Sequence, residues 1–568
     1  MTVAQTTKRR WWVYGLGAFA LIILIGLFSI NSLLAPVVAR RLKAAVDKAG
    51  NHVYTLRFSH LSLNVFTGTL QLDAVQLIAD TGKLMQSADS LGGQAQSLKI
   101  SGVQVLHYLF RKELRIDSIR LEKPVFAYCR RQRTAAKQNP KSMYDKLSGT
   151  LHVLAIGHIR FESAVLAYRD LAIPSAPYLR LKELELDAQQ LLIDSATQQD
   201  TSRTLFCKSI KTRIRRFDGR TTGGLYHYQL SGASFSTADK KLKLEGLSVT
   251  PLPAAQFFKI SRNDRFDFKL ERLEISNVNY TQLVDKQFFF SSRLSGADGS
   301  IAIFGNPHGR PKHNDRIVSF PNYITRKLPV AFRADTLKLT DINVSYSEYN
   351  PQSGQTGTIA FQKTAGRFLH ISNRSEDIKK YPYCTADLST LLLGKVRLKL
   401  SLRFNLSDQQ YSYDYKGTLE GMMADAVNPV TRPLAQVDVT RGRLESLDFA
   451  IAGNRYVSKG VMHMLYNDLE VRLLNDQGQK KLVPTIAVNA FVIKHSNPDS
   501  PGEVPRHADI VFRRPASYPF FKTLWQTLFT GIKACAGIGP AVQPQKDQSI
   551  FSKITTAASK IFKKKAKP

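Results

Sequence analysis

The sequence predicts a mainly β protein with a helix at each end. Three features support this fold class: an uncharged apolar segment near the start, apolar residues that alternate with polar ones through most of the chain, and apolar residues at helical spacing near the end. A period of two places every second side chain on the same face of a strand. We therefore expect an antiparallel sheet with one apolar face and one polar face that is exposed to solvent.

Composition limits the classes of protein that fit. The chain has 568 residues, of which 43% are hydrophobic, so it can bury a large apolar surface. A mean hydropathy of -0.20 excludes a polytopic membrane protein. The net charge of +35 should attract polyanions, but Lys and Arg are scattered through almost every segment. Scattered charge favours a solvated basic face, and we predict no nucleic-acid partner.

The apolar segment near the start predicts a transmembrane helix over residues 11–35. No charged residue occurs between Arg10 and Arg40, and about 20 apolar residues suffice to cross a bilayer. Trp11 and Trp12 stand at its start, where aromatic rings prefer the membrane interface. A cleaved signal peptide is the alternative, but the apolar run is too long and lacks a clear cleavage site. We expect residues 1–10 to be cytoplasmic.

A short amphipathic helix should follow over residues 36–50. Val38, Leu42 and Val46 recur at four-residue spacing, and Gly50 is a natural stop. Beyond Gly50 the apolar period changes from that of a helix to that of a strand.

The clearest strand covers residues 396–406. Its charged residues, such as Lys399, fall on one face and its apolar residues on the other. Shorter alternating stretches begin at Leu179 and Leu242, and one skipped position in each predicts a bulge or bend. The apolar face of the clearest strand consists of Val396, Leu398, Leu400, Leu402, Phe404 and Leu406.

An internal repeat runs through this strand-rich part. Residues 119–128 align with residues 159–168, and less tightly with residues 337–346. Repetition of one strand-turn-strand unit favours an elongated array in which each unit packs mainly on its neighbours.

The chain returns to helical spacing after Pro519. A first amphipathic helix should carry a broad apolar face, and a second should cover residues 550–562, ahead of a basic tail. Two interpretations stay open: helices in a membrane interface, or helices that cap the sheet. The candidate interface residues, besides Trp11 and Trp12, are Phe521, Leu524, Trp525, Leu528 and Phe529.

No motif for catalysis or metal binding is present. The sequence lacks a nucleophile elbow, a phosphate loop and a metal-binding helix. His308, His313 and Asp315 share one loop, but a solvated loop explains them better than a metal site. The four cysteines lie far apart, which favours isolated thiols. We predict a non-enzymatic protein with no catalytic residues, no metal and no cofactor.

Two stretches resemble the AsmA-like proteins of the Gram-negative envelope. The first combines the apolar segment, the short helix LLAPVVARRLKAAVDKAGNHV and a strand pair with its turn at Gly68. The second, residues 442–474, contains Gly460, Tyr466 and the pair Asp468-Leu469 in a similar pattern. The helix around Trp525 and Gly531 is also similar.

This resemblance implies a β-groove: an elongated antiparallel sheet, curled lengthwise, apolar inside and polar outside. It implies an inner-membrane anchor, a periplasmic body over residues 51–515 and C-terminal helices over 516–568. Such proteins are similar to bridge-like lipid carriers, so the expected partners are phospholipid or another acyl lipid and the inner membrane. The outer membrane is a further candidate partner through the C-terminal helices. Residues 396–406 would line the groove.

The alternative function is an assembly or scaffold factor of the envelope. Such a factor would use sheet edges and the basic face to hold proteins or anionic glycolipid. A sheet whose inner face is filled by its own side chains would favour this alternative, because no open trough would remain.

Overall fold

The computed structural model describes residues 33–537, apart from gaps at 49–51, 81–89, 131–143, 145–147, 150, 171–178, 198–199, 201, 222, 281, 284–287, 308–314 and 475–492. The predicted transmembrane helix 11–35, with Trp11 and Trp12, lies almost wholly outside the described residues. So do residues 550–562, the basic tail and both loop histidines. Among the described helices, none is both long and apolar enough to cross a membrane.

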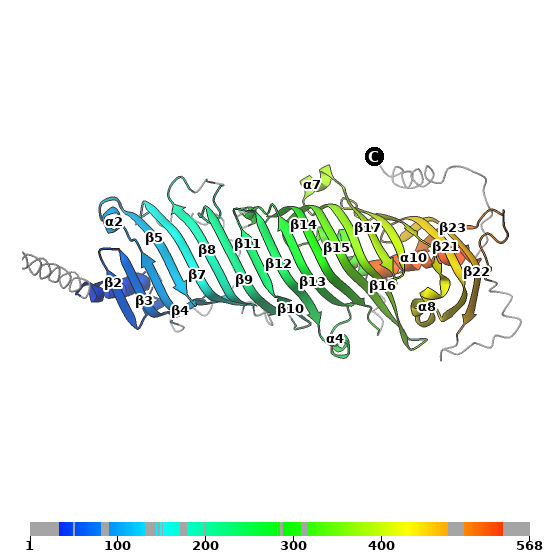
Figure 1. The fold of residues 1–568 in the computed structure, drawn as a ribbon, viewed down its shortest axis with the longest axis horizontal. Helices are drawn as coiled ribbons and strands as arrows, with labels where there is room; N and C mark the ends of the chain where they lie inside the picture. The colour runs from blue at the N-terminus through cyan, green and yellow to red at the C-terminus, as the bar shows by residue number, and fades with distance from the viewer. Residues whose placement is uncertain are drawn as a thin grey trace, which may run out of the picture. The chain divides into compact units, whose positions relative to one another are not determined.

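The chain is mainly β, as the sequence predicts, and its strands form a large curled sheet (Figure 1). The described residues form 23 strands, which lie between Tyr54 and Arg513. Residues 33–48 are helical, close to the predicted helix 36–50. The strands belong to two compact units.

Unit 1 contains the described residues up to Gly224 together with Tyr228–Lys240. Its strands pair mostly with their sequence neighbours, and one short helix precedes β5 (Figure 1). Its elements are β1 (Tyr54–Arg57), β2 (His60–Asn64), β3 (Thr69–Ala79), β4 (Ser90–Ser101), α2 (Val105–Arg111), β5 (Glu113–Glu122), β6 (Val125–Arg130), β7 (Val153–Asp170), β8 (Leu179–Ile193), β9 (Ser209–Arg220), the later part of β10 (Tyr226–Leu230) and β11 (Gly232–Ser236).

The internal repeat of unit 1 forms a parallel pairing. Strands β5 and β6 hold the first copy and β7 holds the second, and equivalent residues face each other. Ile119 pairs with Ile159, and Tyr128 pairs with Tyr168, their rings stacked at 5.8 Å between centroids. The two copies therefore lie side by side. The expectation of an antiparallel sheet is wrong here, because β7 runs in the same direction as β5 and β6.

Unit 2 contains Leu225–His227 and the described residues from Lys241 onward. Strands β14 and β15 repeat the parallel arrangement, a second departure from the antiparallel prediction. Its elements are β12 (Lys241–Pro251), α4 (Ala254–Ile260), β13 (Arg265–Ser276), β14 (Phe288–Phe304), η1 (Arg316–Ser319), α6 (Pro321–Arg326), β15 (Ala331–Asn350), β16 (Gln355–Ser372), α7 (Ser375–Lys380), β17 (Tyr383–Leu392), β18 (Val396–Asn405), β19 (Tyr413–Leu419), β20 (Met422–Met423), η2 (Ala424–Val427), α8 (Asn428–Ala435), β21 (Val437–Gly453), β22 (Val457–Leu473), β23 (His507–Arg513) and α10 (Phe520–Cys535).

Left-handed residues recur at matching places in neighbouring strands of unit 2. Gly246, Asp298, Asp341 and Lys363, on β12, β14, β15 and β16, all have a positive φ between 51° and 58°. At each of them the pairing between strands is interrupted, and between β15 and β16 the register also shifts, which marks a bulge. Local changes of backbone direction at matching places bend neighbouring strands together, so the sheet can curl along this row. A bulge or bend was predicted at both skipped positions: the left-handed Gly246 bends β12 without a register shift, and the left-handed Glu183 lies at a register shift between β7 and β8 of unit 1.

Candidate functional site

The candidate site is the apolar face of the unit 2 sheet. The register places apolar side chains opposite one another from strand to strand, so they form continuous rows across the sheet. In one row Val249 faces Phe268, which faces Ile301 on β14. The row continues through Val344 on β15 to Phe361 on β16. The apolar surface therefore extends across strands rather than ending at each one.

A second row alternates leucine with glycine. Leu273 pairs with Gly296, Gly296 with Leu339, and Leu339 with Gly366. Gly366 has a φ of 154°, and a Cβ there would lie 2.8 Å from a methyl carbon of Leu388. The inner side of a curled sheet crowds its side chains, and at Gly366 the close approach of the neighbouring strand leaves no room for a Cβ.

Exposure of this face changes along unit 2. On β12, β13 and β14 most of the apolar side chains are half-buried, as with Leu244, Leu273 and Leu294. On β18 and the later strands their counterparts are buried, and Phe404, Tyr413 and other apolar residues form one cluster. The face is therefore partly open over the first strands and filled over the last ones.

The C-terminal helix α10 fills the later part of the face. Its residues touch β15, β16, β18, β19, β22 and β23 through aromatic contacts, hydrogen bonds and packing. The sheet of unit 2 therefore curls around this helix (Figure 1). Of the two interpretations of this helix, membrane interface or cap on the sheet, the structure agrees with the cap.

Small residues mark the side of α10 that lies deepest. Thr523, Thr527, Gly531 and Cys535 recur at four-residue spacing and are all buried. A Cβ on Gly531 would lie 2.6 Å from a methyl carbon of Ile510 on β23, so the helix and sheet approach closely. The four-residue spacing of these small residues can be read in the sequence. The larger apolar residues next to them give the stronger helical pattern, so the pattern does not single out the small ones.

The five predicted interface residues of α10 are partly buried. Leu524 and Leu528 pack against the apolar cluster, and Trp525 contacts Phe529 at 5.9 Å between ring centroids. Phe521 lies 4.7 Å from the ring of Tyr346 and is also near Phe361, which belongs to the first apolar row. The first turn of α10 therefore stands where the open part of the face ends.

The predicted groove residues on β18 lie under this helix. Val396, Phe404 and their neighbours alternate with exposed charged residues, as the sequence predicts. Most of them belong to the buried cluster that α10 completes, while Leu400 and Leu402 are partly buried against it. Val396, Leu398, Leu400, Leu402, Phe404 and Leu406 thus line the filled part of the face.

A partly buried ion network holds the end of unit 2 together. Asp315 accepts hydrogen bonds from Arg514 at 2.9 Å and Arg455 at 2.6 Å, and also from the backbone N–H of Ile317. Arg514 is buried and also donates to the carbonyls of Tyr518 and Ala516, just before α10. Burial alone would raise the pKa of Asp315, but the two arginines outweigh it and lower that pKa. Asp315 is thus a structural anion.

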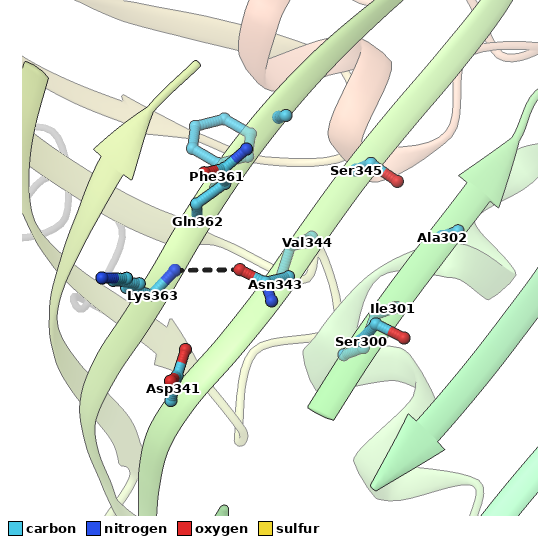
Figure 2. A pocket seen from close by; sticks show the side chains of 11 residues that line it. Ser300, Ile301, Ala302, Asp341, Asn343, Val344, Ser345, Phe361, Gln362 and Lys363 are labelled. Carbon is cyan, nitrogen blue, oxygen red and sulfur yellow. Dashed lines mark hydrogen bonds between the residues drawn. The ribbon is translucent and has the colours of Figure 1, made fainter. Parts of the chain in front are cut away.

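A hollow of about 540 Å³ lies at the bulges of β15 and β16. Figure 2 shows Asn343 and Lys363 meeting there, and the Asn343 side-chain oxygen accepts from the Lys363 backbone N–H at 3.0 Å. Both residues belong to the polar face, opposite Val344 and Phe361. The hollow lies at the bulge between β15 and β16, and its lining also includes Ile301, Val344 and Phe361 of the first apolar row.

Reactive groups are scarce in the described part of the chain. No cluster there could hold a metal ion, and the four cysteines are unpaired thiols. Burial raises the pKa of Cys384 to about 12 and that of Cys535 to about 11. Thiols with such pKa values stay protonated near neutral pH and are poor nucleophiles.

Together these features define a class: a curled-sheet protein with an apolar inner face, open over some strands and capped over others. Scans of the sequence against protein-family models and curated proteins find no match.

Proposed function

We propose that this chain binds acyl lipids on the open apolar face of unit 2 and transfers them within the Gram-negative envelope, as an AsmA-like protein held in the inner membrane. The observation that carries the proposal is the set of apolar rows that run unbroken from β12 to β16. Each buried methylene of an acyl chain gains about 0.8 kcal/mol on leaving water. A row that crosses several strands can therefore hold a chain along its length.

The proposal needs no reactive side chain. Its elongated groove and periplasmic location come from the resemblance to AsmA-like proteins. The part of the face that α10 covers is unavailable to lipid while the helix is in place. We therefore assign lipid contact to β12–β14 and to the part of β15 around Leu339, ahead of β18, with Leu244, Leu273, Leu294 and Leu339 as the residues most directly involved.

A charge on the open face should abolish lipid uptake. Leu339 and Lys338 are neighbours on β15 and point to opposite faces, toward the apolar row and toward solvent. We expect delipidated Leu339→Asp to take up at most a tenth of the phospholipid that the wild type takes up, measured with a fluorescent phospholipid. Lys338→Asp is the matched control and should bind normally, because it faces Arg367 of the neighbouring strand.

Thermal unfolding of both variants shows whether the fold is intact. Equal lipid uptake by the two folded variants would exclude the groove.

The alternative proposal is an envelope scaffold that holds anionic glycolipid on the polar face. Lys338 and Arg367 lie side by side on that face, and Lys399 and Lys416 continue its basic character on β18 and β19. Such a scaffold would bind anionic head groups with strong salt dependence and would not take up acyl chains. Loss of binding in Lys338→Asp with normal binding in Leu339→Asp would favour this alternative.

A further inference from the structure

An exposed apolar surface lies at one end of the first strands of unit 1. It combines the turn between β2 and β3 with the helix α2, which we call together the β2–α2 tip. In the turn Phe66 is 61% exposed, and in the helix Phe110 is 82% exposed. Val65, Val105 and Tyr108 are also exposed, each by 40–47%. Isolated exposed apolar residues are ordinary, but two neighbouring segments that both carry them indicate an interaction surface.

Backbone contacts hold the two segments of the tip together. The N–H of Val103 donates to the carbonyl of Gly68 at 3.0 Å. A Cβ on Gly68 would lie only 2.6 Å from the carbonyl oxygen of Val103, so glycine is required there. The turn itself is fixed by Asn64, whose side chain accepts from the N–H groups of Phe66 and Thr67. The apolar side chains are therefore presented by a rigid support.

The charge around the tip is basic. Arg111 and Lys112 end α2 and are both exposed. Glu113, the next residue, pairs with Arg115 at 3.0 Å, so its charge is offset. The carboxylate of Asp117, on β5, lies close to Gly102, which joins β4 to α2. Aromatic residues flanked by cations are typical of surfaces that lie in the interface of an anionic bilayer.

The length of chain before the tip places it near a membrane. The predicted transmembrane helix ends at residue 35, inside the helix 33–48. Lys43 of that helix lies 4.7 Å from the ring of Phe58, beside the start of β2. Eight helical residues span about 12 Å, and the five residues of β2 span about 17 Å. The tip is therefore within reach of the bilayer surface.

We propose that the β2–α2 tip docks on the anionic bilayer that holds the N-terminal segment, with Phe66, Tyr108 and Phe110 in the interface and Arg111 and Lys112 at the head groups. The tip fixes the orientation of unit 1 on the membrane, which a single spanning helix cannot do. This inference rests on the membrane anchoring of the proposed function and is independent of lipid binding by unit 2.

The test places a tryptophan at the tip of the full chain. Trp11 and Trp12 are first changed to Phe in every variant, which leaves Trp525 as a constant background. Phe110→Trp and Phe66→Trp are then reconstituted in phosphatidylglycerol vesicles with brominated acyl chains. We expect both added tryptophans to lose at least half of their emission to bromine quenching. Adding Arg111→Glu and Lys112→Glu should reduce that quenching in anionic vesicles.

Arg169→Trp is the matched control. Arg169 is exposed near the far end of β7, on the polar face, about 50 Å along the strand from the α2 end, and its tryptophan should not be quenched. Quenching of all three tryptophans, or of none in a chain that floats with the vesicles, would overturn the proposal. A chain that fails to float would contradict the membrane anchor instead, so the two failures are distinguishable.

Discussion

At the scale of single residues, Gly366 and Gly417 allow neighbouring strands of unit 2 to approach more closely than a Cβ would permit. Gly296, Gly366 and Gly417 lie on the apolar face beside leucine side chains of neighbouring strands. A sequence shows only that a glycine interrupts a strand pattern, which also fits a loop or a bulge. Their shared row depends on the register between strands, and register is set by pairing that no single strand reveals.

Gly417→Ala should destabilise unit 2. A Cβ there would lie 2.6 Å from the ring of Phe449 and 2.9 Å from the backbone oxygen of Lys399. Overpacking of this kind costs about 1–3 kcal/mol, which urea unfolding would measure. Gly296→Ala is the control, because its Cβ would meet only ordinary contacts from 3.4 Å outward. Equal loss of stability in both variants would contradict the role of Gly417 in the curl.

At the scale of elements, the alternating strands were predictable and the covering of the sheet was not. The exposed and buried residues of β18 follow the sequence pattern. The repeat of residues 119–128 and 159–168 was visible, but its parallel pairing depends on where the intervening chain returns. For α10, an apolar helix face fits a membrane interface and a sheet interior equally well. Only the contacts of Phe521 and Gly531 with the sheet distinguish the two.

The ion network beside α10 should make unit 2 sensitive to acid. The folded-state pKa of Asp315 is lowered by its arginines, so its contribution to stability is present above the unfolded pKa of about 3.9. It is lost as the pH falls through the lower folded pKa. Asp315→Asn should cost about 3 kcal/mol at pH 7, because Arg514 stays buried with its charge uncompensated. Urea unfolding at pH 7 and at pH 3 would measure both effects.

The control for this variant is Asp414→Asn, which breaks a pair with Arg403, whose side chain is 45% exposed where that of Arg514 is 1% exposed. Its effect should stay below about 1 kcal/mol. Wild type and Asp315→Asn should also become closer in stability at pH 3 than at pH 7. A constant difference between them would show that the carboxylate charge is unimportant.

At the scale of the whole chain, strand periodicity predicts a mainly β molecule, and the structure has one. The division into two units leaves no signal in composition, because the same alternation continues on both sides of residues 225–240. Lipid binding remains a proposal because an apolar face has the same pattern in sequence whether it is open or filled. The difference depends on α10, which begins more than 200 residues after the end of β14.

Native mass spectrometry of the gently extracted full chain tests the central claim most directly. The account predicts phospholipid molecules bound to the wild type, with their number sharply reduced in Leu339→Asp and unchanged in Lys338→Asp. A wild-type chain that carries no lipid, under conditions in which it remains folded, would contradict it.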